Sequence, residues 1–266
     1  MIAARRLVRD RSRSLLWWAL GVGALVVSTT ALYPTVEGNE SLEQLAQDLP
    51  APVVSMLGID EVIGLTSAAG YLHARLFSSI LPVVLLVFGI GLGTRALAGA
   101  EEDGTLELTL AQPITRRRLA TERYSAAAGL IVSLTVVAAV VLVVSAAAAG
   151  ALSGVSMTGL VAACAAAGSL AVLHASIAFA AGAATGRRAI AVGTATTIAA
   201  AGYLVHGLLG VTDVLEPLRF VTPWHWYLAR NMLAHGPALG AVAVPLGVSG
   251  LLFLAGLARF ERRDLR

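Results

Sequence analysis

Long apolar runs alternate with short polar segments along the whole chain. The runs cover residues 14–33, 77–97, 125–150, 158–184, 189–211 and 239–258. A helix crosses the roughly 30 Å hydrocarbon layer of a membrane with about 20 mostly apolar residues, because it rises about 1.5 Å per residue. The pattern therefore predicts an all-α membrane protein with six transmembrane helices, built as a single transmembrane domain over residues 1–266.

The arginines between the runs predict how the chain is oriented. All nineteen basic residues are arginines, and sixteen of them lie before the first run, at the end of the second run or after it, after the fourth run, or after the last run. The opposite side holds only Arg75, Arg219 and Arg230. Because basic residues are enriched on the cytoplasmic side of a membrane, both termini are expected in the cytoplasm, which agrees with an even number of spans.

Two polar segments are expected to form short helices on the membrane surface. In the outer segment, residues 34–76, Ser41 and Gln44 have the spacing of a capping box, and apolar residues then recur at helical spacing until Pro50. At the N-terminus, residues 1–13 carry five arginines among apolar residues. That composition suits a helix along the anionic cytoplasmic leaflet, and contact with a partner protein is the alternative.

Three local features bear on how the spans pack. The segment 224–227, WHWY, precedes the last run, and its aromatic rings are expected to lie in the headgroup zone. Pro82 is expected to remove a backbone hydrogen bond early in the second run, with a local kink. Gly89 and Gly93 form a small-xxx-small pair of the kind that lets two helices approach closely.

Composition excludes several classes of protein. The chain is 57% hydrophobic and 13% charged, with a mean hydropathy of +0.80, whereas about a quarter of the residues of a soluble domain are charged. The net charge of +3 comes from arginines that flank apolar runs, so nucleic-acid binding is not expected. The absence of lysine excludes a Walker A nucleotide site, and the single cysteine, Cys164, excludes an intrachain disulfide and a multi-cysteine zinc site.

Ionisable groups deep inside the spans would indicate a proton-driven transporter or an intramembrane enzyme. The six runs hold no Asp or Glu well inside their bounds, and the remaining candidates for polar groups in a membrane path are His174 and His206. A neutral histidine also hydrogen-bonds between helices, and this structural role is favoured for both. An ATPase-independent secondary transporter or channel that uses His174 or His206 is the alternative; an intramembrane enzyme lacks a carboxylate cluster or nucleophile.

The cytoplasmic segment, residues 98–124, concentrates charge of both signs in an otherwise apolar chain. It contains the stretch EEDGTLELTLAQPITRRR, residues 101–118. The carboxylates before Gly104 suit the start of a helix, and a short helix is predicted over residues 105–112, ended by Pro113. The first half of that helix also alternates as a strand would, but an isolated strand would leave its edges unpaired.

The third helix is expected to begin with Thr115 as its cap and three arginines, residues 116–118, in its first turn. Positive charge at a helix start is disfavoured by about 0.3 to 1 kcal/mol for each site, and anionic lipid headgroups compensate for it. The same headgroups would repel the four carboxylates of the stretch. A segment that keeps both signs close together suits docking onto another protein, where complementary charge sets orientation.

The stretch EEDGTLELTLAQPITRRR resembles the signature of ABC type-2 transporter permeases, which show an acidic pair, Gly-Thr-Leu-Glu, and then a proline and an arginine. The six-span plan agrees with this family across most of the chain. Three shorter segments agree as well: Gly70-Tyr71-Leu72, Thr222-Pro223-Trp224-His225-Trp226-Tyr227 and Arg263-Asp264-Leu265.

The resemblance implies a non-catalytic permease subunit that works in pairs, as a homodimer or heterodimer, above separate cytoplasmic ABC ATPase subunits. ATP and Mg²⁺ would bind the ATPase, and no cofactor or metal is expected in this chain. Coupling to the ATPase is expected through residues 101–118. The residues that would shape and seat this contact are Glu101, Glu102, Gly104, Thr105, Glu107, Pro113 and Arg116.

The resemblance also implies a place and a task. The chain is expected as a multi-pass protein of a bacterial cytoplasmic membrane, surrounded by lipid and exporting a hydrophobic or amphipathic compound. Antibiotic or drug efflux, and hence multidrug resistance, is the commonest expectation in the family. The apolar spans without fixed charge agree with an apolar cargo.

Overall fold

A computed structural model describes residues 2–50, 53, 64–111, 113–208, 213–228 and 230–263. Within these residues all regular structure is helical, and six helices are long and apolar enough to cross a membrane. Their spans are Ser14–Thr35, Ala68–Glu102, Arg116–Ala148, Met157–Thr185, Arg188–Leu208 and Leu239–Arg262. The predicted all-α membrane protein with six transmembrane helices is therefore confirmed.

The second span is a continuous succession of helical turns with two changes of winding. It runs through α4 (Ala68–Leu72), the π-helix η2 (His73–Ile80), α5 (Leu81–Thr94), the π-helix η3 (Arg95–Gly99) and α6 (Ala100–Glu102). Pro82 lies in the first turn of α5, directly after η2. A proline is tolerated at that position because the first N–H groups of a helix lack intrahelical partners.

The helices at this span extend beyond the predicted apolar runs. The second span begins at Ala68 and continues to Glu102, while α8 (Arg116–Ala148) begins at Arg116. Residues 103–115 lie between these two helices, inside the predicted segment 98–124. Apolar runs underestimate such helices because their polar ends extend beyond the hydrocarbon layer.

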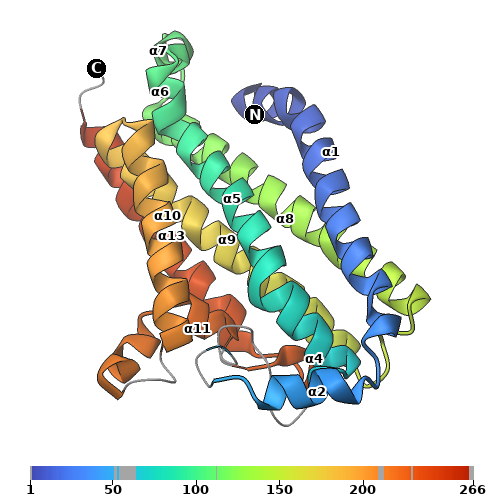
Figure 1. Cartoon of the computed structure of the whole chain (residues 1–266). Helices are drawn as coiled ribbons and strands as arrows, with labels where there is room; N and C mark the ends of the chain where they lie inside the picture. The colour runs from blue at the N-terminus through green and yellow to red at the C-terminus, as the bar shows by residue number, and fades with distance from the viewer. Residues whose placement is uncertain are drawn as a thin grey trace.

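Helix α9 (Met157–Thr185) is the centre of the bundle. It packs against α5, α8, α10 (Arg188–Leu208) and α13 (Leu239–Arg262), while α1 (Ile2–Ala31) packs on α8 (Figure 1). Gly89 and Gly93 face α9 so closely that a Cβ at either position would lie 2.7 Å from the Ala171 oxygen or 2.1 Å from the Ala175 oxygen. The predicted small-residue pair therefore lets the backbones of α5 and α9 touch.

One end of the bundle is covered by short helices: η1 (Tyr33–Thr35), α2 (Glu40–Gln47), η4 (Asp213–Phe220), α11 (Pro223–Leu228) and α12 (Met232–His235). Helix α2 lies across this end (Figure 1). Its predicted cap was wrong, because the Asn39 side chain accepts the N–H groups of Ser41 and Leu42 at 3.1 and 3.3 Å. Ser41 lies inside the helix, which begins earlier than a capping box at Ser41 would place it.

Two rings of the aromatic segment at α11 are buried and hold helices together. Trp224 and Tyr227 are each only 2% exposed. The Trp224 indole N–H donates to the Ala199 carbonyl at 2.9 Å, and the Tyr227 hydroxyl donates to the Phe77 carbonyl at 2.7 Å. These two rings thus join α11 to α10 and to the second span, a packing role that the sequence did not predict.

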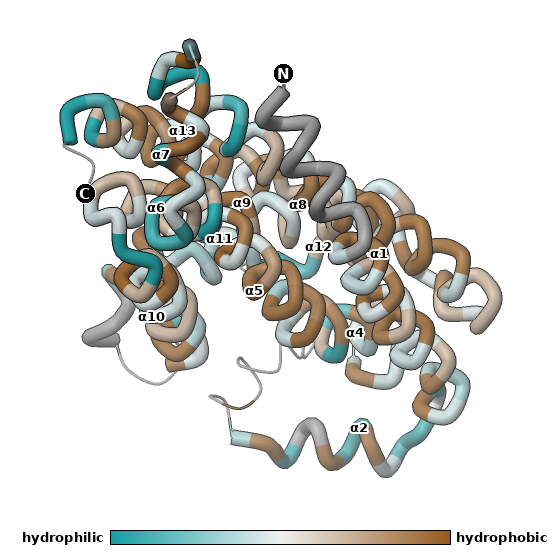
Figure 2. Tube along the Cα trace, turned by 90° about the horizontal axis from the view of Figure 1, so that it is seen from above, coloured by the Kyte–Doolittle hydropathy of each residue, from teal (hydrophilic) through white to brown (hydrophobic). Residues whose placement is uncertain are grey.

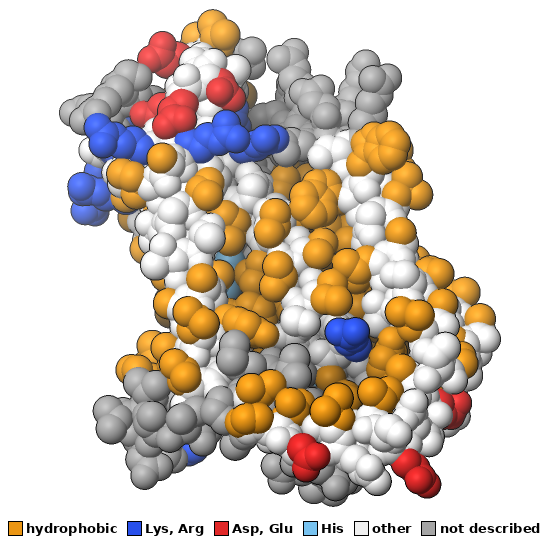
Figure 3. All heavy atoms as spheres, viewed as in Figure 1, with side chains coloured by type: hydrophobic (Ala, Val, Ile, Leu, Met, Phe, Trp, Pro, Cys, Tyr) orange, Lys and Arg blue, Asp and Glu red, His pale blue; other side chains and the backbone are white. Residues whose placement is uncertain are grey.

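The opposite end carries the first turns of α1, which bend across the bundle, together with α6, α7 (Thr105–Leu110) and the end of α13 (Figure 1). Both chain ends thus lie at the same end of the bundle. Figure 2 shows hydrophilic residues gathered around α6 and α7 and hydrophobic residues along α5 and α8. In Figure 3 carboxylates at the tip stand above a band of basic side chains. We call this the cytoplasmic end, after the arginine distribution.

Candidate functional site

The segment between the second and third spans folds as a short helix with two different faces. Gly104 precedes α7 with φ of +66°, a left-handed conformation that glycine adopts without strain. Leu106 is fully buried in a small apolar cluster with Leu119 and Phe260. Leu108 is 73% exposed, and the neighbouring Glu107 is exposed as well. The prediction of a helix in place of a strand is confirmed, although it ends at Leu110.

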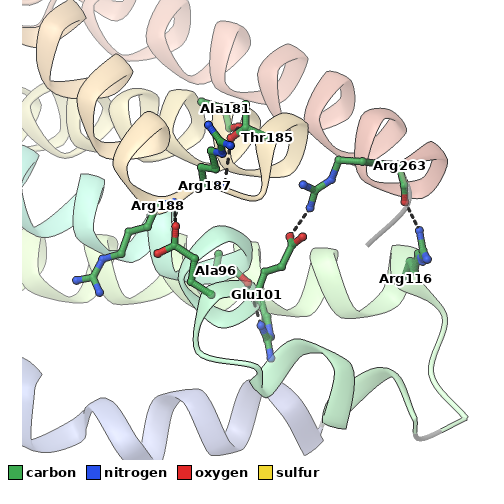
Figure 4. A network of polar contacts seen from close by, with 10 residues as sticks. Ala96, Glu101, Arg116, Ala181, Thr185, Arg187, Arg188 and Arg263 are labelled. Atoms are coloured by element: carbon green, nitrogen blue, oxygen red, sulfur yellow. Dashed lines mark hydrogen bonds and ion pairs between the residues drawn. The ribbon is translucent and has the colours of Figure 1, made fainter. Parts of the chain in front are cut away.

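Glu101 ends the second span and does not begin a helix as predicted. Its carboxylate forms an ion pair with the Arg263 guanidinium at the end of α13, and the two side chains are only 7% and 13% exposed (Figure 4). Negative charge is unfavourable at the C-terminal end of a helix, and this guanidinium compensates for it. The Arg263 carbonyl in turn accepts the Arg116 guanidinium at 2.6 Å. The second, third and sixth spans are thereby joined.

Glu102 closes the turn between α9 and α10. One oxygen of its carboxylate accepts the backbone N–H of Arg188 at 2.9 Å, at the first residue of α10 (Figure 4). The first N–H groups of a helix lack intrahelical partners and favour negative charge. Glu102 thus acts at the start of a helix, but it is the start of α10 and not the start of α7. In the same turn the Thr185 hydroxyl accepts the Arg187 N–H at 3.2 Å.

Arg123 is a buried arginine. In the sequence it counted only as one of the positive charges that predict the orientation of the chain in the membrane. It lies about two turns inside α8, is 9% exposed, and donates through Nη1 to the Ala96 carbonyl of η3 at 3.1 Å. Its Nη2 lies 3.5 Å from the Thr109 hydroxyl of α7. The side chain thus joins α7 to the π-helical turn of the second span. The only signal in the sequence is that Arg123 lies two positions before the predicted apolar run, residues 125–150.

The remaining predicted residues of the stretch are placed as follows. Thr115 caps α8 as predicted, accepting the Arg118 N–H at 3.2 Å. The Thr105 hydroxyl donates to the Ala100 carbonyl at 3.1 Å, which fixes α7 against α6. Of the seven residues expected to form the contact, four are engaged inside the chain: Glu101, Glu102, Thr105 and Arg116. The other three, Gly104, Glu107 and Pro113, are exposed.

His174 and His206 lie in different surroundings and at different depths of their helices. His174 is fully buried in the middle of α9, with Nδ1 2.9 Å from the Leu170 carbonyl. His206 lies in the last turn of α10, where its ring centroid is 5.9 Å from that of His225. Among the described residues no three His, Cys, Asp or Glu side chains are grouped to hold a metal ion.

Six apolar helices, with the two chain ends and the charged α6 and α7 at one end, define a multi-pass membrane protein. A family model described as "ABC-2 family transporter protein" matches residues 1–265. The chain belongs to this family, so the resemblance seen in its sequence is confirmed. A search of curated proteins found no match.

Membership in the family gives the chain its general role. It is a membrane permease of an ABC transporter, and such permeases are generally non-catalytic membrane subunits that associate with an ABC ATPase. This role favours the permease over the ATPase-independent transporter that was the alternative interpretation of His174 and His206.

Proposed function

We propose that the chain is the permease subunit of an ATP-driven exporter in a bacterial cytoplasmic membrane, and that the outer face of α7 is where the separate ATPase docks. The observation that carries the proposal is the two-faced structure of α7. Its inner face is fixed in the bundle through Leu106, whereas Leu108 is 73% exposed directly after the exposed Glu107. A large apolar side chain held out among charges is the arrangement expected of an interface centre with a polar rim.

Fewer residues are available for contact with the ATPase than the sequence pattern of residues 101–118 predicts. Glu101 and Glu102 are held by Arg263 and by the start of α10, so they shape the segment from within. Asp103 and Glu107 are exposed on either side of Gly104. We expect the ATPase to offer an apolar hollow for Leu108 with basic residues around it, because complementary charge sets orientation and register.

The internal contacts supply a route from α7 to the spans. Arg123 connects Thr109 on α7 with the Ala96 carbonyl in η3, and the pair of Glu101 with Arg263 connects the same region to α13. A displacement of α7 on ATP binding would therefore be passed to the second, third and sixth spans together. The π-helical turn at η3 is a suitable place for the change, since such turns often mark functional positions in helices.

The remaining parts of the proposal follow the family. ATP and Mg²⁺ bind the ATPase, and two permease copies, identical or related, form one transporter. The cargo is a hydrophobic or amphipathic compound, with antibiotic or drug efflux as the first class to test. These spans supply apolar surface for such a cargo, and the work comes from ATP hydrolysis in the partner.

Co-purification of the chain with its partner ABC ATPase tests the docking face. The Leu108→Asp, Glu107→Arg double variant should lose most of the bound ATPase while remaining in the membrane fraction. The matched control is Glu40→Arg, an exposed carboxylate on α2 at the opposite end of the bundle. Wild-type ATPase recovery with the double variant would sink the docking assignment.

A further inference from the structure

A cavity of about 230 Å³ opens between α1, α5 and α10 near the cytoplasmic end of the bundle. Its apolar wall includes Trp18 and Phe88, whose ring centroids are 5.3 Å apart, together with Leu92 and Val192. The volume corresponds to roughly eight water molecules at about 30 Å³ each. It is enough for a small headgroup and the beginning of an alkyl chain, and too small for a whole drug-sized molecule, which needs about 300 Å³ or more.

Two arginines line the same cavity, and both are exposed. Arg95 lies where the second span changes to π-helical winding, and Arg188 begins α10. Neither guanidinium forms an ion pair with a carboxylate among the described residues. Glu102 contacts the backbone N–H of Arg188, and Figure 4 shows the guanidinium of Arg188 turned away from that carboxylate. The cavity therefore has two cationic groups whose charge the described part of the chain leaves unpaired.

Thr94, next to Arg95 in the chain, carries a buried hydroxyl without a partner. It lines the cavity, is 1% exposed, and its Oγ1 has no hydrogen-bond partner among the described residues. Threonines elsewhere in the spans behave differently: Thr135 donates to the Ile131 carbonyl and Thr185 to the Ala181 carbonyl, each four residues earlier. A buried unpaired hydroxyl is unfavourable, and a ligand acceptor in the cavity would give it a partner.

We propose that this cavity binds the anionic head of an amphiphile from the inner leaflet, with Arg95 and Arg188 at the head and Thr94 donating to it. The alkyl chain starts against Trp18 and Phe88 and continues into the lipid. Phosphate and carboxylate are the heads that guanidinium groups bind by charge-assisted hydrogen bonds. This inference rests on the proposed function and narrows the cargo class to acidic amphiphiles.

Quenching of Trp18 fluorescence by brominated lipid tests the site without any ATPase. The full-length chain carrying Trp17→Phe is placed in nanodiscs of phosphatidylcholine, and brominated phosphatidylglycerol or brominated phosphatidylcholine is added in steps. A Trp18→Phe variant gives the signal of the other tryptophans for subtraction. The two brominated lipids share their tails, so the ratio of their association constants isolates the effect of the anionic head.

The wild-type site should prefer brominated phosphatidylglycerol by about five- to tenfold, which corresponds to about 1–1.4 kcal/mol. Arg95→Gln combined with Arg188→Gln should bring the ratio close to one, and Thr94→Val should lower it about two- to threefold. Arg187→Gln removes an exposed charge next to Arg188 that does not line the cavity, and it should keep the wild-type ratio.

Three results would overturn the inference. The first is a ratio near one in the wild type, and the second is an equal fall in the ratio with Arg187→Gln and with the double variant. The third is displacement of the lipid by millimolar inorganic phosphate, because that result identifies a free anion as the ligand. Each can occur while the ATPase still binds at α7, so failure of this site and failure of the proposed function are separately visible.

Discussion

The carboxylate of Glu101 and the guanidinium of Arg263 form a largely buried ion pair between residues 162 positions apart in the sequence. The pair joins the end of the second span to the end of α13. Gly186 faces it with a φ of +67°, and a Cβ there would lie 2.7 Å from a Glu101 oxygen. The last turns of three helices and the start of a fourth therefore meet around two neighbouring carboxylates, Glu101 and Glu102.

Glu101→Gln should lower the stability of the cytoplasmic end. The neutral amide leaves the buried Arg263 guanidinium without its counter-charge, which costs about 1–3 kcal/mol. Thermal unfolding of the detergent-solubilised chain, followed by tryptophan fluorescence, measures the change. Glu40→Gln removes an exposed carboxylate at the other end and should keep the wild-type Tm. An unchanged Tm for Glu101→Gln would show that the pair contributes nothing to stability.

Arg123→Lys should partly uncouple transport from ATP hydrolysis. A lysine has a single ammonium group and cannot reproduce the fork that meets both the Ala96 carbonyl and the Thr109 hydroxyl. In reconstituted permease–ATPase vesicles, cargo moved per ATP hydrolysed should fall about three- to tenfold, with ATPase binding unchanged. Arg118→Lys alters an exposed arginine of the same helix and serves as the control. A wild-type transport ratio in Arg123→Lys would remove this residue from the route between α7 and the second span.

Gly93→Ala should disturb the contact between α5 and α9. The added Cβ would lie 2.1 Å from the Ala175 oxygen, so the helix backbones must move apart, at a cost of about 1–3 kcal/mol. Gly91→Ala is a matched control two residues away, because a Cβ there meets nothing within 4 Å. Tm values of the two variants test the difference. Equal values would mean that the close approach is unimportant for stability.

Protonation of His225, on α11 at the end of the bundle opposite the cytoplasmic end, should lower the stability of the protein in mild acid. Burial, and then the positive charge of Arg219, lower the pKa of His225 below its ordinary value of 6.5. As pH falls below about 6.5, the unfolded chain takes up a proton that the folded chain resists, so stability is lost in that range. His225→Gln should flatten the dependence of Tm on pH below about 6.5. A slope as steep as that of the wild type would assign the effect to another group.

The sequence predicted the number and type of spans well because the hydrocarbon layer imposes a length of about 20 apolar residues. It located the polar ends of the helices less well. Residues 98–102 and 116–124 are mostly polar or small but continue the helices beyond the apolar runs. The cap at Asn39 was missed because the capping-box pattern placed the start of the helix at Ser41. In the structure the helix already begins at Glu40.

The internal contacts of the candidate site could not be predicted from the sequence. Thr115 was correctly predicted as the cap of α8, whereas docking of the ATPase at residues 101–118 stays a prediction. The ion pair with Arg263 and the contact of Glu102 with α10 could not be predicted, because they depend on how distant helices meet. Arg123 shows the same limit, since its burial follows from packing against η3 and not from its neighbours in the chain.

Site-directed cross-linking at the outer face of α7 tests most directly whether the ATPase docks there. The only native cysteine, Cys164, is buried, so a new cysteine at an exposed position can be labelled selectively. The Leu108→Cys variant, treated with a short bifunctional thiol-to-amine reagent in the assembled complex, should cross-link to the ATPase. The Leu45→Cys variant, exposed on α2, should not. Docking at α7 is contradicted if the thiol of the Leu108→Cys variant reacts freely with a soluble reagent and gives no cross-link while the complex is assembled and hydrolyses ATP.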